Sequence, residues 1–179
     1  MRKHKNGLKS GFTLIEILIV VAVIGLLVSL VLIGLAPMQK KGRDTRRLSD
    51  LRQAQHGLEI FFNRYGRYPY SGAGCAGGGD CVPACNGTTG GSPADNWNNL
   101  VSCLQNSNLG ISSVSHDPRN VPANGFVYRY GSPNGSIYVL GAKLEENDNP
   151  ALAEDNDSPN LYGVDCQDLP DSPIYCLTL

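Results

Sequence analysis

Glu16 is the first residue whose chemistry needs an explanation, because it lies inside a long apolar run. Residues 12–36 read FTLIEILIVVAVIGLLVSLVLIGLA and contain this one formal charge. A carboxylate in a segment of membrane-spanning length is costly unless it has a partner or a task. We therefore expect Glu16 to pair with a positive group. The alternative is a side chain that reaches the nearby membrane interface without any partner.

Six cysteines form a second reactive set, and all of them follow the apolar run. An even number of cysteines beyond a membrane span indicates disulfides in an oxidising compartment. Cys166 and Cys176 are a candidate pair, and the sequence does not choose among the remaining connectivities. The alternative is a zinc site from the first four, although their spacing lacks CxxC and no histidine is near. The six disulfide candidates are Cys75, Cys81, Cys85, Cys103, Cys166 and Cys176.

A third set is acidic and lies in the segment KLEENDNPALAEDNDS. Hard oxygen ligands on a flexible loop suit calcium, although this spacing does not match the EF-hand form. The alternative is an acidic, solvated loop without a metal. The candidate calcium ligands are Glu145, Asp148, Asp155 and Asp157.

No set of nucleophile, base and acid stands out in the chain. His116 has serines nearby in SVSHDPRN, but this cluster indicates a turn with Asp117 and Pro118. His56 is expected on a helix surface or in packing. We therefore predict that the protein is not an enzyme and requires no cofactor, with calcium as the one candidate.

Residues 12–36 are expected to form a membrane-spanning helix, because at about 1.5 Å per residue they reach roughly 37 Å. Residues 1–11 are short and basic, as in a secretory signal with cleavage after Ala36. However, the run is longer than a usual signal core, and Pro37 follows the candidate bond directly. A secreted protein cut at that bond is therefore the weaker interpretation.

The charge balance argues against a nucleic-acid-binding surface. The net charge is -1, with four of the 15 basic residues before Gly11. The rest of the chain is therefore acidic, whereas phosphate binding along a nucleic acid needs a basic face. No specific nucleic-acid partner is predicted.

The start of the chain, KSGFTLIEILIVVAVIGLLVSLVLIGLAP, resembles type IV prepilins and the pseudopilins of type II secretion. Gly11, Phe12, Thr13, Leu14 and Glu16 all fall in register with the motif of that family. The resemblance implies cleavage between Gly11 and Phe12 by a prepilin peptidase, followed by methylation of the new amino terminus at Phe12. The later stretch RDTRRLSDLRQ…GLEIFFNRYGRYP resembles the major pseudopilin, which binds calcium in the loops of its C-terminal sheet.

Cleavage before Phe12 would give Glu16 its partner. The new α-amino group has a reference pKa near 8 and is largely cationic at neutral pH. In a filament of staggered subunits, this amine meets the carboxylate of the next subunit. At an effective dielectric constant of about 20 such a contact attracts by roughly 4 kcal/mol. A slipped neighbour would leave a buried charge unpaired, so Glu16 is predicted to be an assembly residue that fixes the register.

The remaining elements agree with an α+β, pilin-like fold, in which a long N-terminal helix packs on a small antiparallel sheet. Residues 38–64 place apolar side chains at helical spacing, and Gly66 is a stop signal. A short helix is expected from Asp95 or Asn96. GFVYRY, SIYVLGAKL and PIYCLTL alternate as strands do. We expect a leader at 1–11, a membrane and filament-core helix at 12–36, its amphipathic continuation at 37–65, and a cysteine-rich globular domain at 66–179.

Two features of the sequence disagree about the orientation in the membrane. More Lys and Arg follow the run than precede it, which by the positive-inside rule favours a cytoplasmic domain. We nevertheless expect an extracytoplasmic domain. Asp44 and Asp50 lie within a turn of several of these bases, and the domain is rich in cysteine. The bases after the run are Lys40, Lys41, Arg43, Arg46, Arg47 and Arg52.

The sequence thus predicts a structural subunit of a type IV pilus or of a type II secretion pseudopilus. Its partners would be other copies of itself in a helical homopolymer, the prepilin peptidase, an assembly platform protein with its ATPase, and membrane lipid before assembly. It would reside in the inner membrane as a single-pass protein and then in a filament. The alternative is a membrane-tethered binding module that does not polymerise.

Overall fold

The computed structural model describes residues 11–70 and 93–179, without the side chains of residues 30, 32–34 and 93–95. The chain divides into two compact units, one ending at Gln39 and the other starting at Lys40. The domain boundaries expected at residues 11, 36 and 65 stay predictions.

Helix α1 (Leu14–Tyr65) contributes to both units. Pro37, which directly follows the apolar run of residues 12–36, lies inside this helix. The helix ends where predicted, because Gly66 adopts a φ of 68° that glycine tolerates without a steric penalty. The Gly66 N–H donates to the Phe62 carbonyl at 2.7 Å and so satisfies one of the last carbonyls of the helix.

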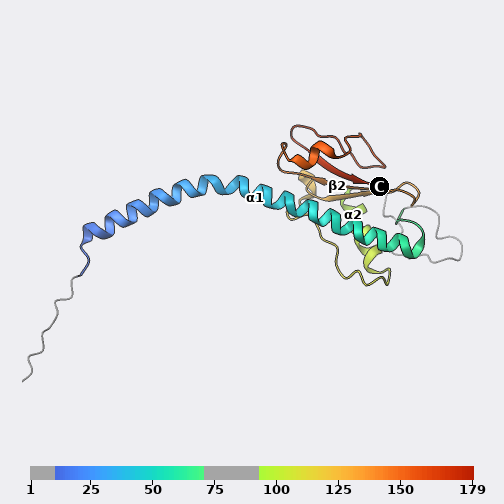
Figure 1. Cartoon of the computed structure of the whole chain (residues 1–179), viewed down its shortest axis with the longest axis horizontal. Helices are drawn as coiled ribbons and strands as arrows, with labels where there is room; N and C mark the ends of the chain where they lie inside the picture. Colours follow the sequence, from blue (N-terminus) through green and yellow to red (C-terminus); the bar gives the residue numbers. More distant parts are fainter. Residues whose placement is uncertain (1–10, 71–92) are drawn as a thin grey trace, which may run out of the picture. The chain divides into compact units, whose positions relative to one another are not determined.

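The second half of α1 buries the apolar stripe that its sequence predicts. Leu51 and Leu58 are fully buried, and Phe61 is nearly so. They form one core with helix α2 (Pro93–Gln105) and with the sheet. The core also takes in Leu48, Phe62 and Tyr65, which are partly buried. Figure 1 shows this part of α1 and α2 beside the strands.

Helix α2 begins earlier than expected. Its first residue is Pro93, so Asp95 and Asn96 lie inside the helix and do not precede it as caps. Proline favours the first helical position because its fixed φ suits the helix and its missing N–H would be unpaired there anyway. The helix presents Trp97, Leu100 and Leu104 to the core.

Three strands form an antiparallel sheet in the order β1-β2-β3. They are β1 (Tyr128–Gly131), β2 (Val139–Lys143) and β3 (Ile174–Thr178). Leu140 of β2 pairs with Tyr130 on one side and Leu177 on the other, so all three share the face that packs on the helices. Two short 3-10 helices, η3 (Pro122–Asn124) and η4 (Pro150–Glu154), lie in the connections. The α+β fold with a long N-terminal helix and a small antiparallel sheet is confirmed.

The opposite face of the sheet carries a smaller apolar cluster that includes a disulfide. Cys166 and Cys176 are bonded to each other, which confirms the pair suggested by the sequence. Cys103 is also disulfide-bonded. The remaining disulfide candidates, Cys75, Cys81 and Cys85, lie outside the described residues.

Candidate functional site

The start of α1 is closed by a reciprocal pair of hydrogen bonds between Thr13 and Glu16. The Thr13 N–H and the Thr13 hydroxyl each donate to Glu16 Oε2 at 2.7 Å. The Glu16 N–H donates back to the Thr13 hydroxyl at 3.3 Å. This arrangement is a capping box, in which two otherwise unpaired N–H groups at a helix start are satisfied. Glu16 therefore has a structural task within its own chain.

The capping box was missed in the sequence, although its signature was present. Thr13 and Glu16 stand three residues apart immediately before and within an apolar run, which is the spacing that marks such a cap. Both Thr13 bonds end on Oε2, and Oε1 of Glu16 accepts no hydrogen bond from the described residues. One carboxylate oxygen thus holds the helix start while the other is left for a further donor.

The residues at the predicted cleavage point lie in the open. Phe12 is 86% exposed, and Gly11 is exposed as well. A Cβ added at Gly11 would meet no atom within 4 Å. The peptide bond between them precedes helix α1, so it is exposed outside any helical turn.

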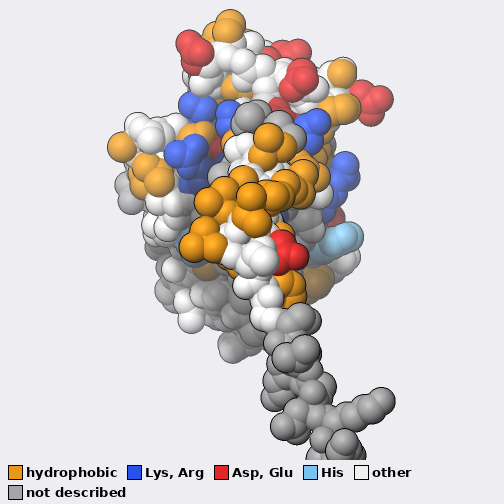
Figure 2. Space-filling model, turned by 90° about the vertical axis from the view of Figure 1, so that its left-hand side faces the viewer, with side chains coloured by type: hydrophobic (Ala, Val, Ile, Leu, Met, Phe, Trp, Pro, Cys, Tyr) orange, Lys and Arg blue, Asp and Glu red, His pale blue; other side chains and the backbone are white. Residues whose placement is uncertain are grey.

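The first half of α1 exposes apolar side chains over its whole circumference. Figure 2 shows hydrophobic side chains gathered on this part of the molecule. Soluble proteins rarely leave a large contiguous apolar surface uncovered, so such a surface indicates an interaction with lipid or with protein. The exposed large apolar residues of this segment are Phe12, Leu14, Ile15, Ile17, Leu18, Ile19, Val20, Val21, Val23, Ile24, Leu26, Leu27, Val28, Val31, Leu35 and Met38.

Comparison with protein families decides what this segment is. A family model described as the prokaryotic N-terminal methylation motif matches residues 7–36. The chain carries a prokaryotic N-terminal methylation motif. This motif is the prepilin-type leader of type IV pilins and pseudopilins, so the resemblance is confirmed for residues 7–36. Comparisons with curated proteins and with solved structures gave no match.

The motif contains Gly11, Phe12 and Glu16, and their predicted roles in processing and assembly stay predictions. Over the part of the chain that the structure describes, no helix has the length and hydropathy needed to cross a membrane.

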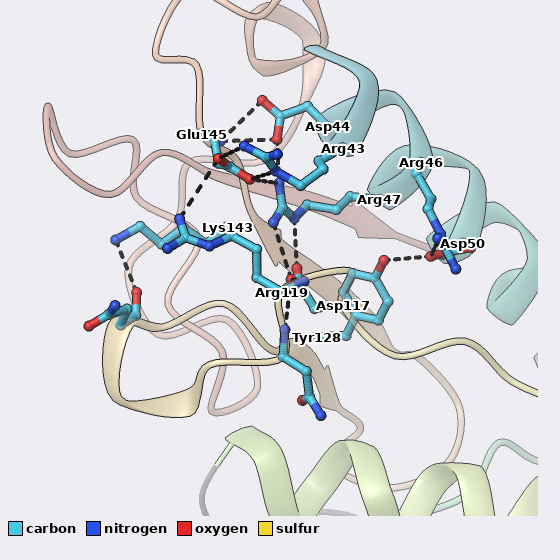
Figure 3. A network of polar contacts seen from close by, with 12 residues as sticks. Arg43, Asp44, Arg46, Arg47, Asp50, Asp117, Arg119, Tyr128, Lys143 and Glu145 are labelled. Carbon is cyan, nitrogen blue, oxygen red and sulfur yellow. Dashed lines mark hydrogen bonds and ion pairs between the residues drawn. The ribbon is translucent and has the colours of Figure 1, made fainter. Parts of the chain in front are cut away.

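Beyond the motif, a largely buried cluster of charges joins the second half of α1 to the loop of Asp117 and to the end of β2. We call Arg43, Asp44, Arg47, Asp117 and Glu145 the arginine clamp (Figure 3). Arg47 is fully buried and donates to both oxygens of Asp117, at 2.6 and 3.1 Å. It also donates to Asp44 at 2.7 Å and to Glu145 at 2.9 Å.

The clamp joins parts of the chain that lie far apart in sequence. The carboxylate of Glu145, just after β2, binds Arg43 through two hydrogen bonds of 2.7 and 2.6 Å. Asp44 accepts from the backbone N–H of Glu145 at 3.0 Å and of Glu146 at 3.1 Å. Bidentate arginine–carboxylate pairs fix both distance and orientation. The turn of Asp117 and the end of β2 are thereby fixed against the same face of α1.

The clamp bears on two predictions from the sequence. Asp117, which the sequence suggested as a turn residue, also serves as the buried partner of Arg47. The basic residues that favoured a cytoplasmic domain are partly neutralised: Arg43 and Arg47 pair with carboxylates, and Arg46 lies 3.8 Å from Asp50. The local neutralisation that we inferred from Asp44 and Asp50 thus holds for Arg47 and Arg46, whereas Arg43 pairs with Glu145.

The clamp also removes Glu145 from the candidate calcium ligands. Its hydrogen bonds with Arg43, reinforced by Arg47, lower the pKa of Glu145 to about 2. Both of its oxygens already face guanidinium groups, so a cation there would have to displace an arginine. The four predicted calcium ligands are therefore not brought together, and Asp148 belongs to no metal-binding group among the described residues.

Asp155 and Asp157 instead lie with Asp168, a residue that the sequence did not suggest. Their carboxylate oxygens fall within 4.8 Å of one another beside β3. Burial, with the nearby charges of Asp168 and Asp157, raises the pKa of Asp155 to about 6. One oxygen of Asp155 accepts the Cys176 N–H at 2.7 Å. The other, Oδ1, is buried without a hydrogen-bond partner among the described residues and so has the chemistry of a cation ligand.

Proposed function

We propose that this chain is the precursor of a structural filament subunit, a type IV pilin or a pseudopilin. A prepilin peptidase cuts it between Gly11 and Phe12, and the new amino terminus at Phe12 is methylated. The subunit then polymerises through the first half of α1. The observation that carries this proposal is the methylation motif on a helix whose apolar side chains are exposed all round.

In this proposal Glu16 acts twice. Before cleavage its Oε2 caps the helix through Thr13. After cleavage the Phe12 amine of a neighbouring subunit approaches Oε1, and the two charges attract by roughly 4 kcal/mol at an effective dielectric constant of about 20. Desolvation offsets part of this attraction, so its main effect is to penalise any register that leaves the carboxylate unpaired.

The apolar first half of α1 has two successive environments in this proposal. Residues 12–36 anchor the precursor in the inner membrane, with the cysteine-rich domain on the extracytoplasmic side. Assembly, driven by a platform protein and its ATPase, then transfers the same surface from lipid to the helices of neighbouring subunits. The protein acts as a structural subunit and not as an enzyme.

We also propose that Asp155, Asp157 and Asp168 bind calcium. Carboxylate oxygens are the ligands that calcium prefers, and a cation relieves the repulsion among three carboxylates. Asp155 and Asp168 already accept the N–H groups of Cys176 and Ile174 in β3. The ion would therefore stabilise the loops that cover the free edge of the sheet.

The proposed assembly role is tested by separating the charge of Glu16 from its cap. Glu16→Gln keeps a side chain that completes a capping box but removes the charge. Thr13→Ala removes the hydroxyl of the cap but keeps the charge. We expect filaments to be lost in Glu16→Gln and retained in Thr13→Ala, as counted in sheared preparations from the native host.

The opposite result would contradict the assembly role of the Glu16 charge. Filaments in Glu16→Gln and none in Thr13→Ala would show that the cap, and not the ion pair, controls assembly. Intact mass and N-terminal peptide analysis of the same samples checks the processing step. A chain that starts at Phe12 with one added methyl group supports the prepilin route. A chain that starts at Met1 in a membrane fraction without filaments supports a tethered module instead.

A further inference from the structure

A pocket of about 400 Å³ lies beside the arginine clamp, within the unit that starts at Lys40. Three basic side chains line it: Lys40, Arg119 and Lys143. Figure 3 shows Arg119 and Lys143 on the side of Glu145 away from α1. The calcium and filament proposals make no use of this pocket.

The ring of Phe126 contacts two of these cations without accepting a hydrogen bond from their N–H groups. The Arg119 guanidinium lies 4.1 Å from the centre of the Phe126 ring, and the Lys143 amine lies 5.2 Å from it. Cation–π contacts of this kind hold a charge in place but accept no conventional hydrogen bond. The contacts with Phe126 therefore use none of the N–H groups of these two side chains.

The basic side chains of the pocket make few hydrogen bonds and ion pairs with the described residues. Lys143 makes one hydrogen bond, to the Asn124 carbonyl at 3.3 Å. Arg119 makes an ion pair of 3.8 Å with Glu145, and its side chain donates no hydrogen bond within the described chain. Lys40 is exposed and has no ion pair with any described residue.

The acidic groups of the pocket do not balance these cations. Glu145 lines the pocket, but its carboxylate is shared by Arg43 and Arg47. Asp171 is the other acid and lies exposed. A ligand that fits must be an anion with several acceptor oxygens, so that one group meets an arginine fork and two ammonium groups together. Phosphate has this chemistry.

We propose that the pocket of Lys40, Arg119 and Lys143 binds the phosphate of an anionic ligand. A lipid headgroup and free phosphate share this chemistry. The lipid source rests on the proposed membrane anchoring of residues 12–36, because Lys40 follows that segment by four residues. At most roughly 14 Å of extended chain separates the two.

The test measures both sources on the full chain in neutral detergent. Retention of added phosphatidylglycerol is followed by native mass spectrometry, with phosphatidylcholine as the zwitterionic comparison. Binding of inorganic phosphate is followed by titration calorimetry. The variants are Lys40→Gln, Arg119→Gln and Lys143→Gln. The matched control is Lys41→Gln, which removes the same charge from the neighbouring exposed position outside the pocket.

We expect each pocket variant to bind roughly fivefold more weakly, as is typical for loss of one basic residue near an anionic surface, and Lys41→Gln to bind like the unaltered chain. Binding of phosphatidylglycerol alone assigns a lipid headgroup, and equal competition by inorganic phosphate assigns free phosphate. Equal weakening in Lys41→Gln, or no saturable binding in either arm, overturns the proposal.

Two further readouts keep this proposal separate from the filament proposal. The fluorescence of buried Trp97 reports whether each variant is folded. Processing before Phe12 and filament number are measured on the same variants in the host. The inorganic phosphate arm needs no membrane, so failure of filament formation leaves that arm intact, and failure of phosphate binding leaves processing intact.

Discussion

Replacing Arg47 by methionine tests how much the arginine clamp stabilises the unit that starts at Lys40. Methionine keeps an unbranched apolar stem but lacks the guanidinium group and donates no hydrogen bond. The change removes two bonds to Asp117, one to Asp44 and one to Glu145. Arg43 then remains as the only clamp cation for three carboxylates, two of which are fully buried.

The expected loss follows from the charges that are left behind. Removing one partner of a buried ion pair destabilises a protein by about 3–5 kcal/mol, because the remaining charge is buried without compensation. For a unit of this size, that corresponds to a drop in the unfolding midpoint of roughly 10–20 °C. Arg46→Met is the matched control, since Arg46 is 64% exposed and lies 3.8 Å from Asp50. Asp50 itself is buried, but the exposed guanidinium of Arg46 is screened by water, so this pair is expected to contribute about 0–1 kcal/mol.

The assay uses the single tryptophan of the chain. Trp97 is 2% exposed in the core of the sheet unit, so its emission reports unfolding of that unit and is insensitive to the apolar start of α1. Adding Asp117→Asn to Arg47→Met should recover part of the loss, because it removes one uncompensated charge. If Arg47→Met and Arg46→Met unfold within about 1 kcal/mol of each other, the reasoning from buried charge is wrong.

Three further predictions concern pH, covalent bonding and calcium. Because the pKa of Glu145 falls from 4.5 to about 2 on folding, its stabilisation is complete above pH 4.5 and is lost as the pH falls toward 2; Glu145→Gln should flatten that part of the stability curve. Changing both Cys166 and Cys176 to serine should cost about 2–3 kcal/mol of unfolding free energy in denaturant titrations, and no change would contradict the chain-entropy estimate. Calcium at about 100 times its Kd should stabilise the chain by about 2.7 kcal/mol. In thermal unfolding, Asp155→Asn should abolish this effect and Asp148→Asn should leave it, whereas loss of the effect in both variants would favour the ligand set suggested by the sequence.

Much of the fold was predictable because its signals are local. The apolar stripe around Leu51 and Leu58 has helical spacing, and Gly66 is a stop signal within one turn of the helix end. The strands alternate with a period of two, so their existence followed from the sequence. Their order did not, because pairing of β3 with β2 joins segments separated by about thirty residues.

Of the candidate functional site, too, the features that are local in sequence were predictable and the long-range contacts were not. The methylation motif is a contiguous pattern, so Gly11, Phe12 and Glu16 could be named from the sequence, and the Thr13 cap was readable there too. The partners of Arg47 and the addition of Asp168 to the acidic cluster could not. These contacts join residues up to 102 positions apart, as between Arg43 and Glu145.

The sequence by itself determined that the chain begins with a basic leader, an apolar helix and a carboxylate in register, because these properties depend on residue type and spacing alone. Only the tertiary structure decided which carboxylates form ion pairs with arginines and which lie close to one another beside β3. Charges act through space, and their distances are set by how the sheet packs on α1.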